Sequence, residues 1–399
     1  MKIAILTSGI LPVPAVQGGA VENLIDFYLE YNNLHQLHDI SVYSVWHPDV
    51  ERHTALKSEV NHYQYINTSS SLAKIRRKLY QAMHTHEYYN HYIEYFFEQA
   101  YQLIRKHSYD CIILENRPGY VYKLSRRGYT NLILHLHNDL LNSNTPHSQD
   151  IYNHLNKVVT VSNYIKQRVE TIPPPPSVAN NKVVTVYNGI NLHHFKRQQL
   201  PTISRENLGF SNHDFVLVYS GRLNKDKGIA QLIDAMSLLK DLPQIKLMIL
   251  GSTFFGDAIN ENDFVRALKE KSQPISERLL FTGFVPYQLM PQYLQLADVA
   301  IIPSVWPEPF GLTVAEAQAM GLPTITTQQG GIPEIVSQEN AVILSTGQCF
   351  ANHLADAIRH LYNSPEQRAN MAASALQNST HYDKEYYSHQ FFNAIESIS

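Results

Sequence analysis

Residues 299–323, VAIIPSVWPEPFGLTVAEAQAMGLP, contain the pattern that decides the fold. A short, wholly apolar segment, Val299–Ile302, is followed by a proline-rich loop and then by a helical pattern that begins around Gly311. A continuous apolar strand is typical of a parallel sheet that is covered on both faces. In such sheets, ligands bind where the carboxyl end of a strand runs into the next helix. The segment therefore predicts an α/β fold with a ligand site in the loop around Glu308.

The same alternation of apolar strands and helical patterns continues along the whole chain. In the first half, strands are predicted at Lys2–Thr7, Ile40–Val45, Cys111–Leu114, Leu132–Leu136, Lys157–Val161 and Lys182–Tyr187. In the second half, they are predicted at Phe215–Ser220, Lys246–Leu250, Leu279–Thr282, Val299–Pro303, Thr324–Thr326 and Ala341–Leu344. This number of strands would overfill one doubly wound sheet, so the sequence predicts two parallel-sheet units that are joined by a linker at Asn191–Ser211.

The composition limits the possible functions of this chain of 399 residues. Lys and Arg number 32 against 35 Asp and Glu, a net charge of −3, so nothing indicates a nucleic-acid partner, which usually leaves a basic surface. Two distant cysteines, Cys111 and Cys349, argue against a zinc cluster, a redox motif or a disulfide framework. The amino terminus lacks a signal-peptide pattern, and no run reaches the ~18 apolar residues of a membrane span. These features predict a cytoplasmic enzyme.

Two glutamates flank the start of the helix that the opening segment predicts. Glu308 is expected in the loop, and Glu316 in the early turns of the helix. The backbone amides of Phe310, Gly311 and Leu312 suit an anion, because amides at a helix start have no partner inside the helix. Carboxylates repel an anion but accept hydrogen bonds well from hydroxyl groups, so the combination indicates the hydroxyls of a sugar or a ribose. The alternative is that both glutamates are solvated surface residues.

A cationic loop follows the first predicted strand of the second half. The stretch GRLNKDKG, residues 221–228, places Arg222 and Lys227 five residues apart, before a helix predicted over Ile229–Leu239. Two cations could neutralise a pyrophosphate without a metal ion, and the loop fits neither the P-loop nor the dinucleotide-binding glycine pattern. No two aspartates are separated by a single residue, so the DxD metal–nucleotide motif is absent. The alternative is a basic, solvated loop.

The first half offers weaker signals. Gly18 and Gly19 precede a predicted helix, where glycines let backbone amides approach a ligand closely; a plain flexible loop is the alternative. His135 and His137 lie at the end of the strand Leu132–Leu136 and share one of its faces. A metal could bind this pair, but no set of partner residues is evident in the sequence. A buried core or rim histidine is the alternative for His135.

Together these motifs resemble those of the retaining glycosyltransferases with the GT-B fold, specifically family 4. The resemblance covers nearly the whole chain, and its most specific part is the E-x7-E pattern from Glu308 to Glu316. It implies two Rossmann-like domains that face each other across a cleft, with a last helix that returns to the first domain. The expected domains are residues 1–196 with 378–399, and residues 197–377. Further matching motifs are GRLNKDKG at 221–228, VYNGIN at 186–191, GGIPEIV at 330–336, LFTGFV at 280–285 and the amino-terminal GGA.

The resemblance also implies roles for residues of the second half. Glu308 would contact hydroxyls of the donor sugar and stabilise charge at the reacting centre, and Glu316 would hold the ribose. Arg222 and Lys227 would hold the diphosphate, and Phe284 would lie beside the base. The amides expected beside the diphosphate are those of Phe310, Gly311 and Leu312.

In the first half, the resemblance implies that Gly18 and Gly19 approach the donor phosphates. His137 would lie near the donor sugar and is expected to be the second catalytic residue. The family often has an aspartate directly after this histidine, whereas here Asn138 comes first and Asp139 second.

The expected reaction is transfer of a hexose from a UDP-sugar to an acceptor hydroxyl, with retention of the anomeric configuration. Neither a metal nor another cofactor is expected. The acceptor would be a glycan, a lipid-linked saccharide or a glycoprotein in cell-surface glycan synthesis. The alternative is a GT-B-like protein that binds sugars for another glycosyltransferase without turnover; the intact set of Glu308, Glu316, Arg222 and Lys227 argues against it.

A basic run at residues 74–78 bears on where the protein would act. On a helix, such a run could meet an anionic membrane surface, where a lipid-linked acceptor would reside. The expected location is then cytoplasmic, with weak contact at the inner face of the membrane. The alternative is a solvated basic helix, because the sequence shows no long apolar face beside the run.

Overall fold

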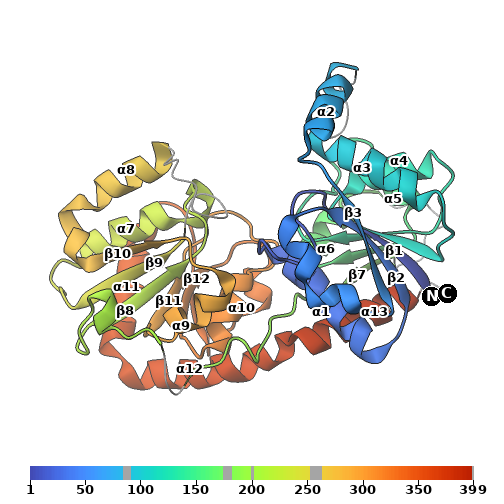
Figure 1. Ribbon diagram of the computed structural model, residues 1–399. Helices are drawn as coiled ribbons and strands as arrows, with labels where there is room; N and C mark the ends of the chain where they lie inside the picture. The colour runs from blue at the N-terminus through green and yellow to red at the C-terminus, as the bar shows by residue number, and fades with distance from the viewer. Residues whose placement is uncertain (84–90, 174–181, 199–201, 252–262, 398–399) are drawn as a thin grey trace. The chain divides into compact units, whose positions relative to one another are not determined.

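The computed structural model describes residues 1–83, 91–173, 182–198, 202–251 and 263–397 (Figure 1). It divides the chain into two compact units. Unit 1 comprises Met1–Gly189 with Lys384–Ser399, and unit 2 comprises Ile190–Asp383. Each unit contains one parallel sheet whose strands are connected through helices, which confirms the predicted fold class of two Rossmann-like domains.

Unit 1 is built on a seven-stranded sheet in the order β3-β2-β1-β4-β5-β6-β7, with every neighbouring pair parallel. The order reverses between β1 and β4, and α/β sheets bind ligands at the carboxyl ends of the strands on either side of such a reversal. The strands are β1 Lys2–Leu6, β2 Asp39–Val45, β3 Asn61–Ile66, β4 Cys111–Glu115, β5 Leu132–Leu136, β6 Lys157–Thr160 and β7 Val183–Thr185. The helices are α1 Ala20–His35, α2 Ser71–Met83, α3 His91–Ile104, α4 Pro118–Ser125, α5 Ser148–His154, α6 Asn163–Glu170 and α13 Lys384–Glu396.

Helix α13 belongs to unit 1 although it follows the whole of unit 2 in the sequence. Its Phe391 ring stacks on Tyr28 of α1, with 4.3 Å between the ring centroids. Tyr387, Phe391 and Ile395 are buried and recur every four residues, so they lie on one face of the helix. Burial of these large side chains ties the end of the chain to unit 1.

Unit 2 is built on a six-stranded parallel sheet in the order β10-β9-β8-β11-β12-β13. Its order reverses between β8 and β11, so the loops after these two strands meet at the predicted ligand edge. The strands are β8 Phe215–Ser220, β9 Ile245–Leu250, β10 Leu279–Gly283, β11 Val299–Ile302, β12 Thr324–Thr327 and β13 Ala341–Leu344. The helices are α7 Ile229–Leu238, α8 Asp263–Ser272, α9 Met290–Leu294, α10 Leu312–Ala319, α11 Phe350–Asn363 and α12 Pro365–Ser379.

Strand β3 is missing from the sequence prediction. Its sequence, NHYQYI, mixes polar and aromatic residues, and only Asn61 and Ile66 are buried. β3 lies at one edge of the sheet of unit 1, next to β2. The prediction relied on continuous apolar runs, which mark strands buried on both faces, so it missed a half-exposed edge strand.

Helix α2 carries the predicted basic run and projects from the body of unit 1 (Figure 1). Ala73 is buried, whereas Leu72, Ile75 and Leu79 are each more than half exposed. These three side chains lie on one face of the helix, because they are three, four and seven residues apart. The structure therefore reveals an apolar face beside the basic run. None of the helices within the described residues combines the length and the apolar character that crossing a membrane requires.

Candidate functional site

The loops after β8 and β11 are joined backbone to backbone at the strand-order reversal of unit 2. The amides of Val305 and Trp306 both donate hydrogen bonds to the carbonyl oxygen of Asp226, at 2.9 and 3.2 Å. Gly228, with φ of 68°, lies so close that a Cβ at this position would overlap the carbonyl oxygen of Pro303. The glycine that ends the motif GRLNKDKG is therefore required for the two loops to meet.

Lys227 and Glu308 form an ion pair in which Lys227 Nζ lies 2.5 Å from Glu308 Oε1. The Ser304 hydroxyl donates a hydrogen bond to the same oxygen. Lys227 is positioned by its own backbone, because its amide donates to Asn224 Oδ1, 3.2 Å away, across a single 3-10 turn. Glu308 is buried, so two donors hold its carboxylate in a fixed orientation while Oε2 takes part in neither bond.

The motif GGIPEIV secures the backbone of Glu308 from the other side. The amide of Gly331 donates to the carbonyl oxygen of Glu308 at 2.7 Å. Gly330, with φ of 62°, packs against the backbone of Glu308 without room for a Cβ. Both glycines of this motif therefore hold the loop that presents the Glu308 carboxylate.

Glu316 is buried on α10, and burial raises its pKa to about 8. Tyr287 lies close enough that burial and the charge of Glu316 together raise the tyrosine pKa well above its usual range. At the start of α10, the first hydrogen bond inside the helix runs from the Val314 amide to the Gly311 carbonyl at 2.9 Å. The amides of Gly311 and Leu312 precede that bond and can donate to an anion.

The other residues that were predicted for the site in unit 2 lie outside the Lys227–Glu308 ion pair. The Arg222 side chain is exposed and takes no part in the Lys227–Glu308 ion pair, while its carbonyl accepts from the Tyr219 hydroxyl at 2.9 Å. Phe284 is half-buried in the loop after β10. The Phe310 side chain is buried and meets the ring of Tyr382 edge-on, so this residue also has a packing role.

In unit 1, Gly18 and Gly19 lie after β1, where Gly19 precedes the first residue of α1. Both have positive φ, 74° and 109°, and a Cβ on Gly19 would overlap the carboxylate of Glu22. Glu22 is buried, accepts from the Ser8 hydroxyl at 3.4 Å and has its pKa raised to about 7, chiefly by burial. Glu22 is not among the residues predicted from the sequence, although a carboxylate three residues after a Gly-Gly pair was a visible signal.

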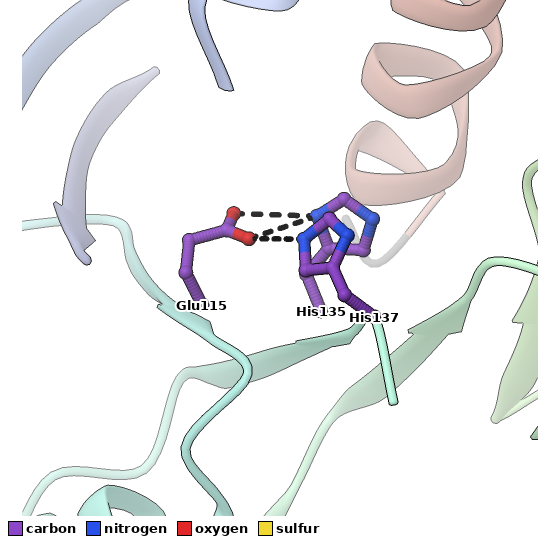
Figure 2. A group of neighbouring side chains, drawn as sticks. All are labelled: Glu115, His135 and His137. Carbon is purple, nitrogen blue, oxygen red and sulfur yellow. Dashed lines mark hydrogen bonds and ion pairs between the residues drawn. The ribbon is translucent and has the colours of Figure 1, made fainter. Parts of the chain in front are cut away.

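His137 belongs to a buried cluster that Figure 2 shows together with His135 and Glu115. Glu115 Oε2 lies 2.8 Å from His137 Nε2 and 3.1 Å from His135 Nδ1, and Oε1 accepts from the Tyr28 hydroxyl at 2.9 Å. Burial alone would raise the pKa of Glu115, but the contacts with His135 and His137 lower it to about 2. Burial and the neighbouring His135 lower the pKa of His137 to about 4. The carboxylate is therefore ionised and His137 is neutral at pH 7.

Glu115, His135 and His137 place three possible metal ligands within 4.8 Å of one another. Two histidines and a glutamate are a donor set that binds zinc. In such sites the outer nitrogen of each histidine almost always donates to a carboxylate, a carbonyl or water. Here, among the described residues, His135 Nε2 and His137 Nδ1 are buried without a hydrogen-bond partner. The geometry therefore favours a hydrogen-bonded cluster over a metal centre.

Glu115 is the main residue of this cluster that sequence reasoning missed. It is the charged residue that ends the apolar run of β4, next to the strand-order reversal between β1 and β4. A charged residue in that position was a usable signal. Its partners could not be found in the same way, because Tyr28 comes from α1, His135 from β5 and His137 from the residue directly after β5.

The chain resembles known proteins in sequence and in fold. Residues 202–378 match the family model described as glycosyl transferases group 1. Over 340 residues the chain is 27% identical to YtcC of Bacillus subtilis (strain 168), provisionally named a glycosyltransferase, covering 82% of this chain and 75% of that protein. It is 28% identical over 340 residues to spore coat protein SA of the same strain, covering 82% and 81%.

Among solved structures, Alr3699/HepE of Anabaena in complex with UDP-glucose matches over 100% of both chains, with a TM-score of 0.72 and 22% identity. A likeness at this level of identity reports on the fold, whereas the family model and the sequence relatives report on the class of enzyme. Residues 202–378 therefore form a glycosyl transferases group 1 domain, and the chain has the GT-B fold.

Proposed function

We propose that the protein is a glycosyltransferase that moves a hexose from a UDP-sugar to an acceptor hydroxyl with retention of the anomeric configuration. The observation that carries the proposal is the Lys227–Glu308 ion pair at the carboxyl edge of β8 and β11. A cation for phosphate and a carboxylate for hydroxyl groups lie side by side there, which matches the two ends of a nucleotide sugar. UDP is chosen because HepE, which has the same fold, has been solved with UDP-glucose.

In this proposal, the diphosphate lies at the loop after β8 and at the start of α10. Lys227 has three N–H donors and gives one to Glu308, so the others can reach phosphate, together with the exposed Arg222. The backbone amides at the start of α10 add hydrogen-bond donors that are fixed in place and carry no formal charge. Glu316 holds the ribose hydroxyls, and Phe284 lies beside the base. The amides concerned are those of Phe310, Gly311 and Leu312.

Glu308 then acts on the sugar. Lys227 and Ser304 hold Oε1, so the remaining lone pairs of the carboxylate accept from donor-sugar hydroxyls. As the bond to the diphosphate breaks, the sugar gains oxocarbenium character, and a preorganised carboxylate stabilises that positive charge. The departing phosphate takes the proton of the acceptor hydroxyl, which arrives on the same face of the ring. For the residues of unit 1, we propose that His137 binds a hydroxyl of the sugar and that the Gly18–Gly19 loop binds phosphate.

The experiment that tests this function is a screen of nucleotide sugars. Purified protein is mixed with UDP-glucose, UDP-galactose, UDP-N-acetylglucosamine, GDP-mannose and dTDP-rhamnose, and both thermal stabilisation and release of the nucleotide are measured. We expect a UDP-sugar to stabilise the protein most and to be hydrolysed slowly without an acceptor. Release should continue in EDTA, because we propose that Lys227 and Arg222 replace a metal. Stabilisation without any turnover, with or without saccharide acceptors, would instead support a non-catalytic sugar-binding partner.

We also propose that α2 contacts an anionic membrane surface, where a lipid-linked acceptor for cell-surface glycan synthesis would reside. Leu72, Ile75 and Leu79 form an exposed apolar face. Arg76 borders it on one side, four residues after Leu72, and Lys78 on the other, three residues after Ile75. The 13 residues of α2 include no acidic residue, so the helix complements an anionic surface.

Sedimentation with vesicles tests this contact. The protein should sediment with phosphatidylglycerol vesicles more than with phosphatidylcholine vesicles, and salt should weaken the binding. Replacing Leu72, Ile75 and Leu79 by serine should weaken binding at least about tenfold, because the buried apolar area is lost. Leu34→Ser changes a leucine of α1 that is as exposed as Leu72, and it should have no effect. Absence of salt-sensitive binding to anionic vesicles would remove this part of the proposal.

A further inference from the structure

The cluster around His137 fixes where the protons of its imidazole ring lie. An ionised carboxylate only accepts hydrogen bonds, so a ring nitrogen that contacts it must carry a hydrogen. His137 Nε2 lies 2.8 Å from Glu115 Oε2 and therefore donates to it. A neutral imidazole has one N–H, so His137 Nδ1 is left as a bare acceptor.

The carboxylate has other donors, which hold it in place. The Tyr28 hydroxyl donates to Oε1 at 2.9 Å, and His135 Nδ1 lies 3.1 Å from Oε2. Phe391 of α13 covers this side of the cluster. The centroid of its ring lies 4.3 Å from that of Tyr28 and 5.0 Å from that of His135. The Glu115 carboxylate is wholly buried, so its position is set by these contacts and not by solvent.

The other face of His137 is where the cluster is unsatisfied. Nδ1 is buried and has no hydrogen-bond partner among the described residues. The backbone of His137 is fixed independently, because its amide donates to Asn116 Oδ1 at 3.1 Å. A buried acceptor without a donor costs free energy, so a ligand that supplies a hydroxyl hydrogen would be favoured there.

We propose that Glu115 is a positioning residue that holds His137 with its hydrogen on Nε2, so that Nδ1 accepts a hydrogen bond from a substrate hydroxyl. This rests on the proposed function, in which His137 binds a hydroxyl of the sugar. It gives His137 a defined chemical part: the residue accepts from a hydroxyl of the sugar and does not donate to the diphosphate.

The direct test is nitrogen NMR on protein labelled at the histidine ring nitrogens. In wild type, His137 should show a protonated Nε2 and an unprotonated Nδ1, and its signals are identified by their loss in His137→Gln. In Glu115→Gln, which removes the charge, His137 should become a mixture of both neutral forms. Glu94→Gln is the matched control, because Glu94 is another buried carboxylate of unit 1 and pairs with Lys123. It should leave the signals of His137 unchanged.

Turnover gives a second measurement, made with whichever nucleotide sugar of the screen is hydrolysed fastest. Glu115→Gln should lower kcat about 10–100-fold, the usual effect of removing the group that orients a functional histidine, while Kd for UDP stays within about twofold. His137→Asn keeps an oxygen near the place of Nδ1, whereas His137→Gln keeps only the contact with Glu115. The asparagine variant should therefore retain about tenfold more activity.

Several results would overturn the inference. They are a protonated Nδ1 on His137 in wild type, an unchanged His137 in Glu115→Gln, or His137→Gln exceeding His137→Asn in turnover. Stoichiometric zinc in the purified protein that disappears in Glu115→Gln would also overturn it, in favour of a metal centre. If wild type hydrolyses none of the nucleotide sugars, the proposed function fails, whereas the ring-nitrogen signals still decide the inference.

Discussion

The two units present the side chains proposed to be functional at equivalent edges of similar sheets, but they hold them by different means. In unit 2, Lys227 and Glu308 are held by short loops whose backbones touch at Gly228 and Gly330. In unit 1, the carboxylate of Glu115 is held by side chains from α1 and β5, under the aromatic face of α13. The unit 2 site therefore depends on close backbone packing, whereas the unit 1 site depends on side-chain packing by a helix from the end of the chain.

The largest expected effect comes from breaking the packing of α13 on unit 1. Phe391 is fully buried against Tyr28 and His135, so Phe391→Ala should destabilise unit 1 by about 3–5 kcal/mol. The chain has two tryptophans, Trp46 in unit 1 and Trp306 in unit 2, so each unit can be followed separately. Urea unfolding in a Trp306→Phe background reports on unit 1.

The control for this change is on the same helix. Tyr386 is 57% exposed, so Tyr386→Ala should change the stability of unit 1 by no more than about 0.5 kcal/mol. The transition of unit 2, followed by Trp306 in a Trp46→Phe background, should not move in either variant. An equal shift in both units would mean that α13 does not belong energetically to unit 1 alone.

The next effect concerns chemistry in unit 2. Lys227→Ala and Glu308→Ala should each lower sugar transfer at least about 100-fold, because each removes a group proposed to meet charge in the transition state. Lys225→Ala removes an exposed cation from the same 3-10 turn and should leave the rate nearly unchanged. Steady-state kinetics on the screened donor measure all three variants. Near wild-type rates in either Lys227→Ala or Glu308→Ala would contradict the proposal that these residues form the donor site.

The same difference between the two units explains which features could be predicted from the sequence. Strands that are buried on both faces are recognisable in the sequence as continuous apolar runs, so the parallel α/β units were predicted. The edge strand β3 has no such run and was not predicted. In unit 2, Lys227 lies beside Gly228, so one motif contains both, and Glu308 is held by Gly330 and Gly331 of a second recognisable motif. In unit 1, Glu115 is 87 residues from Tyr28, and spacing along the chain says nothing about such a contact.

A smaller effect tests the backbone contact at Gly228. Alanine there must adopt a positive φ and also overlap the carbonyl of Pro303, whereas alanine at Gly209 meets only the first problem, with φ of 80° and open space. Both variants should lose about 1–2 kcal/mol from backbone strain, and Gly228→Ala should lose about 2 kcal/mol more. Urea unfolding of unit 2 with Trp306 as the reporter measures the difference. Equal losses would show that the loops can separate without cost.

The smallest expected effect is a pH dependence in unit 2. Burial raises the pKa of Glu316 to about 8, so this side chain is mostly protonated at pH 7 before ligand binds. If its carboxylate accepts from the ribose, UDP selects the ionised form, binding releases a proton, and affinity should rise about tenfold between pH 7 and pH 9. The phosphates of UDP are already ionised in this range and add little. Calorimetry in buffers of different ionisation enthalpy measures both the affinity and the proton release.

Glu316→Gln separates the pH dependence caused by Glu316 from that of other ionisable groups, because it keeps the shape of the side chain and removes its charge. Its affinity for UDP should be nearly independent of pH between 7 and 9. The stability of the ligand-free protein should change with pH in the opposite direction to the affinity for UDP. Because the carboxyl pKa is raised on folding, wild-type stability falls as the pH rises from the unfolded pKa of 4.5 through about 8. Glu316→Gln should lack that fall. A wild-type affinity that does not rise with pH would mean that Glu316 meets the ribose as a protonated donor. Its hydrogen bond to the ribose would then run in the opposite direction to the one proposed for His137, which accepts.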